Sequence, residues 1–288
     1  MPNYDEIIVA SAFFALLLGE FAAGMYKNNN RQPGEWLVDG ISFIQLGLIK
    51  PTILLITFFM AQLLFPDAKD SLQGLPFWVG FLIVFLPDDL SHYWIHRLAH
   101  NFPWLWGLHR THHTPNVYHV SIAFRENWLW FWVMPGLWWA GVMVYLGLIE
   151  QVILSAAIIG THNVWLHHGS TKDQALYQHR FIGPFMQRLE YIINTPGLHR
   201  GHHGLGKNSV PYGNFSQTLS LWDVIFGTAT FNKGAPPEYY GTTNPESMKQ
   251  RWYYQLWWPL FKKQTSILPN DKPASWPFKK SICKCLST

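Results

Sequence analysis

Apolar residues gather in five long runs that short polar stretches separate. The runs cover residues 7–26, 41–65, 75–96, 128–149 and 151–166. A helix needs roughly 20 apolar residues to cross the hydrocarbon core of a bilayer, and most of these runs reach that length. The pattern therefore predicts an all-α, multi-pass membrane protein with about four to five membrane-embedded helices.

Polar residues inside the runs predict where helices bend or end. Glu20 lies within the first run, where it would face a partner helix, a cavity or the membrane interface. Lys50-Pro51 interrupts the second run and predicts a kink or a broken helix there. Glu150 and Gln151 are the clearest break between the last two runs. So short a connection predicts an antiparallel hairpin.

The third run sets the expected geometry. Leu75 and His96 are 21 residues apart, which a helix spans in roughly 32 Å, one hydrocarbon thickness. His96 should therefore emerge at the far membrane surface. The hairpin formed by the last two runs should bring His167 back to that same surface.

Composition and charge support a membrane protein with its histidines on the cytoplasmic side. Of the residues, 49% are hydrophobic and 13% charged, whereas soluble domains carry about 25% charged residues. Seventeen of the 21 Lys and Arg residues follow residue 88, which predicts an external N-terminus and a cytoplasmic histidine region. The membrane would be the inner membrane of a bacterium or the endoplasmic reticulum of a eukaryote. The basic balance should face anionic lipid headgroups rather than nucleic acid.

All 14 histidines lie between His92 and His203. Three groups have spacings of three and four residues, which place imidazoles on one helix face: His96 and His100; His109, His112 and His113; His199, His202 and His203. Neutral imidazole suits iron, zinc or copper. Eight convergent imidazoles are too many for one ion and enough for two, so we expect a dinuclear site in a cytoplasmic helical cap. A lone histidine is more often a packed core residue, but three such groups are not explained in that way.

The ordered segments HRLAH (96–100), HRTHH (109–113) and HRGHH (199–203) resemble the three histidine boxes of the fatty acid hydroxylase/sterol desaturase superfamily of membrane di-iron enzymes. Asn194-Thr195-Pro196, YGNF at 212–215 and WDVIFGT at 222–228 add to the resemblance. It covers about residues 75–230 and is most similar to the branch that contains alkylglycerol monooxygenases and bacterial sterol-desaturase-like proteins.

The resemblance implies two iron ions, O2 as co-substrate and electrons from outside the chain. The donor would be of the cytochrome b5 or ferredoxin type, or a tetrahydropterin. The implied metal ligands are His96, His100, His109, His112, His113, His199, His202 and His203. His167 would be a ninth ligand, because WLHHG resembles the isolated histidine that family members place between the second and third boxes.

Three carboxylates are candidates for supporting the ligands, and five histidines are less clear. Asp89 lies seven residues before His96, on the same helix face, and would accept an imidazole N–H. Glu190 and Asp223 are further candidates of this kind. His119, His162, His168 and His179 would be surface or supporting residues, and His92 and His162 remain open as ligands.

The expected function is oxidation of a lipid that enters from the bilayer, such as a sterol, a fatty acyl chain or an ether lipid. Hydroxylation and desaturation begin with the same hydrogen abstraction, so an acyl-lipid desaturase is an alternative. A histidine-rich metal transporter or metal-binding membrane protein is another. A transporter would place its ligands near mid-membrane, whereas these boxes fall at the ends of the apolar runs. The predicted division is 1–74 for N-terminal membrane helices, 75–231 for the catalytic domain, and 232–288 for an interfacial segment and basic tail.

Overall fold

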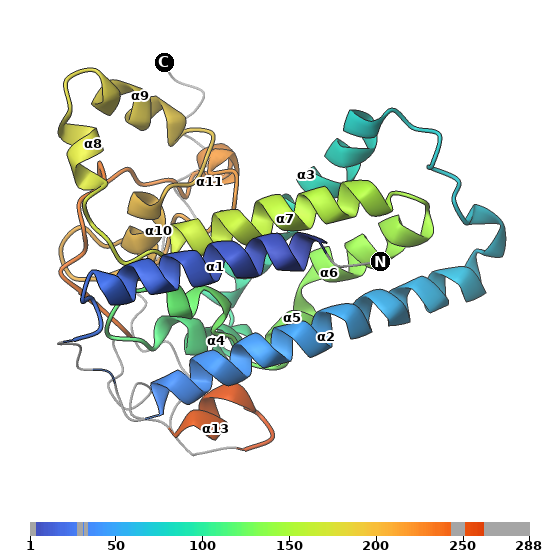
Figure 1. Ribbon diagram of the computed structural model, residues 1–288, viewed down its shortest axis with the longest axis horizontal. Helices are drawn as coiled ribbons and strands as arrows, with labels where there is room; N and C mark the ends of the chain where they lie inside the picture. The colour runs from blue at the N-terminus through green and yellow to red at the C-terminus, as the bar shows by residue number, and fades with distance from the viewer. Residues whose placement is uncertain (1–3, 28–30, 32–33, 243–250, 262–288) are drawn as a thin grey trace.

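Long helices run side by side along the longest axis of the molecule (Figure 1). The computed structural model describes residues 4–27, 31, 34–242 and 251–261. Helices α1 (Tyr4–Ala22), α2 (Glu35–Leu64), α3 (Phe77–Ala99) and α7 (Ile149–Leu166) correspond to four of the five apolar runs. α1 packs on α7, while α3 packs on both α7 and α6 (Pro135–Tyr145).

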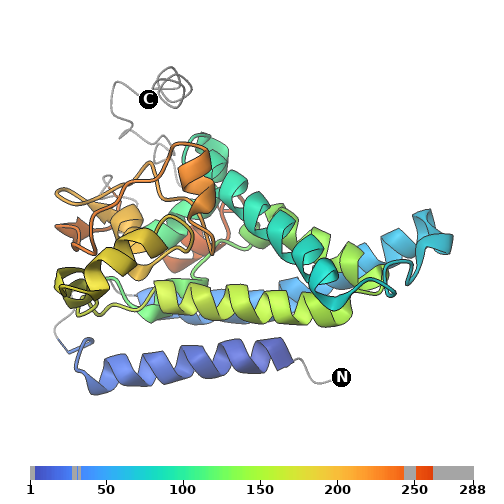
Figure 2. The same cartoon turned by 90° about the horizontal axis from the view of Figure 1, so that it is seen from above.

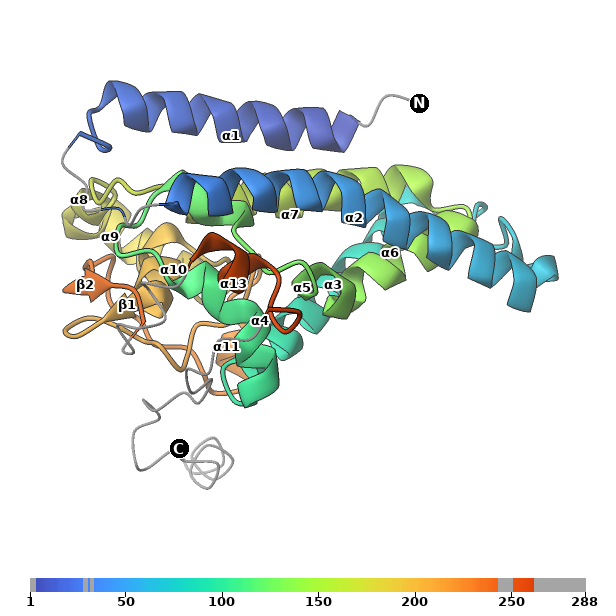
Figure 3. The same ribbon diagram turned by 90° about the horizontal axis from the view of Figure 1, so that it is seen from below.

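Short helices gather at one end of the long ones, where α7 ends and α2 begins (Figures 1 and 3). Figure 2 shows the same separation from above, with the N-terminus near the other end. The gathered short helices are α4 (Pro103–His113), η2 (Val120–Phe124), α8 (Gln174–Gln178), α9 (Ile182–Leu189), α10 (Pro196–His203), α11 (Leu221–Ile225) and α13 (Trp252–Leu256). α5 (Trp130–Val133) leads into α6, and η1 (Pro66–Ala68) follows the other end of α2. Strand β1 (Gly204–Leu205) pairs antiparallel with β2 (Tyr239–Tyr240).

Proline decides two boundaries that the apolar pattern left unresolved. The run 128–149 is not one helix, because it divides into α5 and α6 at Pro135. The proline ring disfavours a helical conformation in the preceding residue, and Met134 is extended. In contrast, α2 continues through Pro51, so the predicted interruption does not divide it.

The predicted hairpin forms between α6 and α7, with its turn a few residues earlier than expected. The connection is Leu146–Leu148, and Gly147 adopts a φ of 96°. Only glycine takes that conformation without strain. Glu150 and Gln151, which were expected to form the break, belong to the first turn of α7.

Among the helices of the described residues, α2 is long and apolar enough to cross a bilayer; the apolar part of α1, Ile7–Ala22, is shorter. The predicted number of about four to five membrane-embedded helices thus stays a prediction.

Three apolar clusters hold these elements together. One joins α1 to η2 and α7, a second lies between α3, α4 and α5, and a third joins α3 to α6 and α7. Trp258, just after α13, belongs to the second cluster. The segment predicted to be interfacial, 251–261, is therefore partly packed into the core. The basic tail with Cys283 and Cys285 lies outside the described residues.

Glu20 faces the protein interior, which settles its role among the three that the sequence allowed. Its carboxylate accepts hydrogen bonds from the backbone N–H groups of Val120 and Gly169, at 3.1 and 2.7 Å, and from the Tyr26 hydroxyl at 2.6 Å. Gly169 lies two residues after His167. α1 therefore fixes the loop that carries His167.

Substitution of Glu20 tests that support. Glu20→Ala leaves two backbone N–H groups without an acceptor and should cost about 1–3 kcal/mol, seen as a lower midpoint of thermal unfolding in detergent. Glu150→Ala, at an exposed position in the first turn of α7, is the matched control and should change stability by only a few tenths of a kcal/mol. Equal midpoints for the two variants would contradict the assignment.

Candidate metal centre

Local sequence explains why the second and third histidine boxes form short helices, whereas the first box ends the long helix α3. α4 begins with Pro103 and α10 with Pro196, and proline is favoured at the first helical position. The Thr195 hydroxyl accepts a hydrogen bond from the Leu198 N–H and caps α10. His100 and His167 are the C-terminal caps of α3 and α7. All three boxes and His167 thus lie at the C-terminal ends of helices, in the part of the molecule where the short helices gather.

The nine histidines that sequence analysis selected come together in two buried groups. The ligand atoms of each group lie within 4.8 Å of one another. The first group combines α3, α4 and α10, and consists of His96, His100, His109, His113 and His202. The second combines α4, the end of α7 and α10, and consists of His112, His167, His199 and His203.

Backbone carbonyls fix the tautomer of four of these imidazoles. A carbonyl can only accept a hydrogen bond, so the Nδ1 that faces it must carry the proton and Nε2 keeps a lone pair. The pairs are His96 with Phe215 (2.7 Å), His202 with Gly213 (2.9 Å), His167 with Asn163 (2.8 Å) and His112 with Arg125 (3.3 Å). Such carbonyl partners are typical of histidines that bind a metal through the other nitrogen.

The lone pairs so defined point at one another. Nε2 of His112 and Nε2 of His167 are 3.1 Å apart, and neither carries a proton. Two bare lone pairs at that distance repel. A cation relieves the repulsion, since nitrogens about 2.1 Å from one ion and at right angles are about 3 Å apart. The Nε2 atoms of His96, His100 and His202 are likewise buried without a partner within the described chain. Both groups therefore fit a metal ion.

Burial keeps the imidazoles of the second and third boxes neutral. It lowers the pKa of His112, His113, His202 and His203 well below the ordinary value of 6.5, and neighbouring imidazoles lower it further. Neutral imidazole is the form that binds metals. The donor set is thus ready for a cation at neutral pH. Imidazole nitrogens suit iron, zinc and copper alike.

Within the described residues, Asp89 is bonded to the loop after the third box and not to an imidazole, which corrects the expectation from its position in the sequence. Its two oxygens accept from the backbone N–H groups of Thr218 and Leu219, at 2.9 and 3.0 Å, and from Nε1 of Trp222 at 2.8 Å. The loop after the third box folds back over α3 and takes up the carboxylate. Asp89 therefore holds that loop.

Asp223 and Glu190 act one step away from the ligands. Asp223 accepts from the N–H groups of Phe215 and Ser216, at 2.9 and 2.8 Å, and the Phe215 carbonyl in turn orients His96. Glu190 accepts from the hydroxyl of Thr195, the residue that caps α10, at 2.7 Å. Each carboxylate positions backbone that holds or carries a ligand.

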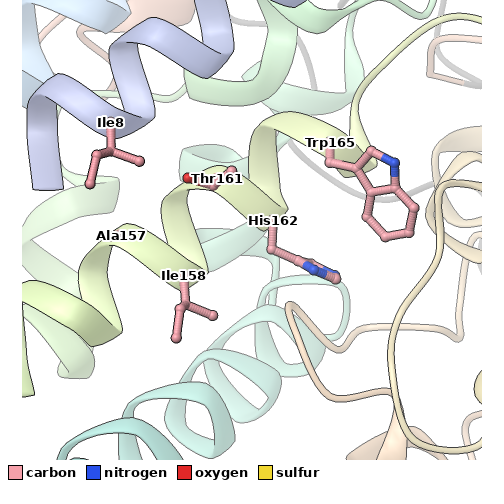
Figure 4. Close-up of a pocket in the computed structure, with 6 residues that line it drawn as sticks. All are labelled: Ile8, Ala157, Ile158, Thr161, His162 and Trp165. Carbon is pink, nitrogen blue, oxygen red and sulfur yellow. The ribbon is translucent and has the colours of Figure 1, made fainter.

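The remaining histidines lie outside both groups, within the part of the chain that is described. His92 is on α3 and contacts the His96 ring edge to face. His162 lines an open groove with Trp165 of α7 and Ile8 of α1 (Figure 4). His119 is buried and bonded to Ser121, whereas His179 is exposed and His168 is bonded to the Trp165 carbonyl.

Sequence analysis missed the buried charges beside the second box. Arg125 is fully buried and donates to Asp39 of α2, to the Thr111 carbonyl and to the Thr114 hydroxyl. Glu126, 7% exposed, lies against His109 and His112. Burial raises the pKa of the Glu126 carboxyl well above its ordinary value. The sequence feature that could have indicated these charges is the pair Arg125-Glu126, which lies just before the aromatic run at 128–139.

The sequence model described as fatty acid hydroxylase matches residues 81–228, about half of the chain. Alkylglycerol monooxygenase of Danio rerio is 27% identical over 264 residues, which cover 86% of this chain and 54% of the relative. The Homo sapiens protein of that name is 28% identical, covering 84% and 51%. Methylsterol monooxygenase 1-2 of Arabidopsis thaliana is 28% identical, covering 51% and 45%. The chain thus spans about half the length of these relatives. No solved structure matches it significantly.

The two-group arrangement predicts which histidines control metal content. His167→Ala removes one of four donors from the second group and should lower bound metal toward one ion per chain, measured by elemental analysis of purified protein. His162→Ala, five residues earlier on the same helix, is the matched control and should leave the content unchanged. Loss of metal in the control and retention in His167→Ala would reverse the assignment.

Proposed function

The chain belongs to the fatty acid hydroxylase family, and on that premise we propose that it is a membrane-bound di-iron oxygenase that hydroxylates, or oxidatively desaturates, a lipid. The observation that carries the proposal is the pair of facing Nε2 lone pairs of His112 and His167, 3.1 Å apart. Such a contact between buried, neutral imidazoles needs a cation between the two nitrogens. Membership of the family indicates the kind of reaction in which that cation would take part.

We assign the nine grouped histidines as the metal ligands, five for one iron and four for the other. Bound iron would activate O2 for attack on an unreactive C–H bond. The chain itself holds the imidazoles neutral and oriented, through backbone carbonyls that accept from Nδ1. Burial of all nine keeps bulk water from the centre. O2 and electrons would come from outside the chain.

The relatives that cover most of this chain point to an ether lipid as the first substrate to test. They are named alkylglycerol monooxygenases, and they match across more than four-fifths of the chain. The methylsterol monooxygenase matches only about half of it. A sterol or a fatty acyl chain is therefore the second class to test. We further propose that electrons reach the centre from a cytochrome b5-type or ferredoxin-type protein or from a reduced pterin.

Turnover of lipid is the direct test. Cells that make the protein and cells that lack it are compared by lipid mass spectrometry, with 18O2 supplied. Hydroxylation should place one 18O atom in the product, whereas desaturation should place none and remove two hydrogens. The double variant His112→Ala/His203→Ala, which changes two donors of the second group, should abolish turnover. His179→Ala, an exposed histidine, should not. Identical lipid profiles with and without the active protein would refute the proposal.

We also propose that the metal centre faces the cytoplasm. In Figure 1 the first residues of α1 lie at the end of that helix away from α8, α9 and α10. Seventeen of the 21 basic residues follow residue 88, as the positive-inside tendency requires for a cytoplasmic cap.

Reporter fusions check that orientation. A reporter after Thr230 should be active in the cytoplasm, and one at the N-terminus should be active outside. A reversed pair of activities would refute the orientation and leave the metal centre untouched.

A further inference from the structure

Glu126 lies where the two histidine groups meet. A single oxygen, Oε1, is 3.6 Å from Nδ1 of His109, in the first group, and 3.5 Å from Nδ1 of His112, in the second. The contact is on the Nδ1 side of both rings, away from the nitrogens that converge on the metal positions. One carboxylate therefore touches one ligand of each group from behind.

The backbone of Glu126 is fixed to α2. The Ser42 hydroxyl donates to the Glu126 carbonyl at 3.1 Å and accepts from its N–H at 3.2 Å. Next to it, Arg125 pairs with Asp39 on the same helix at 3.0 Å. Ser42 and Arg125 are fully buried. The carboxylate is thus held in place by a long helix that contributes no histidine to either group.

Among the described residues, the carboxylate of Glu126 lies against two imidazoles, those of His109 and His112. Its second oxygen, Oε2, is buried and has no hydrogen-bond partner among the described residues. The Arg125 guanidinium is directed to Asp39, Thr111 and Thr114 instead. A buried carboxylate without a compensating partner is costly by several kcal/mol. Imidazole N–H groups polarised by bound cations would supply that compensation.

We propose that Glu126 is a positioning residue that couples the two metal positions: its Oε1 accepts the Nδ1–H of His109 and shares the Nδ1–H of His112 with the Arg125 carbonyl. The inference rests on the metal site of the proposed function. A carboxylate that serves both groups should, when removed, weaken both ions together. Asp223 serves as the comparison. Its carboxylate accepts from the N–H of Phe215, and the carbonyl of Phe215 accepts from His96, so the hydrogen bonds described above connect Asp223 to the first group.

The test compares Glu126→Gln with Asp223→Asn in full-length protein. Both changes keep the shape of the side chain and remove its charge. Each protein is loaded with 57Fe, and iron release to a chelator is followed together with the Mössbauer spectrum. Loss of a carboxylate behind a ligand typically lowers metal affinity 10–100-fold. Glu126→Gln should show that loss for both ions and shift both iron signals. Asp223→Asn should shift one.

Unchanged signals in Glu126→Gln, or a change at one ion only, would overturn the coupling. Glu126→Asp keeps the charge and shortens the side chain, so it should fall between the wild type and Glu126→Gln; it also provides a reading if the glutamine variant does not fold. Repeating the chelator experiment with Co2+ separates this inference from the proposed function. If the wild type turns over no lipid but binds two ions, the function fails, and the Co2+ affinities of the variants still decide the role of Glu126.

Discussion

Mutual repulsion between buried imidazole nitrogens is the constraint on which the rest of the structure depends. In the second group, neighbouring Nε2 atoms are 3.0–3.2 Å apart from His112 through His167 and His199 to His203. Nε2 of His112 and Nε2 of His167 both lack a proton, and two such nitrogens in a dry interior repel each other. The surrounding protein must hold each ring by its other nitrogen, and a cation must complete the group. The carbonyls that face Nδ1 of His112 and His167 meet the first requirement.

Buried carboxylates hold the chain segments that surround these rings. Asp89 and Asp223 accept from backbone N–H groups of the 215–219 segment, and Glu190 holds the cap of α10. Glu20 does the same for the loop after His167. Asp89, Asp223 and Glu20 satisfy backbone N–H groups of irregular segments, and this allows such segments to surround a precisely arranged site. The cap therefore depends on side-chain acceptors more than on regular secondary structure.

The convergence of the three histidine boxes was predictable from sequence because helix geometry ties spacing to direction. Residues three and four apart on α4 and α10 had to share a face, and those are the histidines that meet. The partners of the supporting groups were not predictable, because they lie far apart in the chain. Asp89 accepts a hydrogen bond from the N–H of Thr218, 129 residues later in the chain, and no local sequence pattern predicts such a contact. Glu126 was missed for the same reason, since a single glutamate has no periodicity. Pro135 could have been read as the end of α5 from its effect on Met134.

The order of the ligands along the chain has a consequence for biosynthesis. Both groups include residues of α10: His202 in the first, and His199 with His203 in the second. Neither group can be completed before the ribosome has passed residue 203, by which time α1, α2, α3 and α7 have all been made. A cation that needs either complete group can therefore bind only after these four helices have been made. A chain truncated before α10 would carry about seven-tenths of the given sequence and neither complete group.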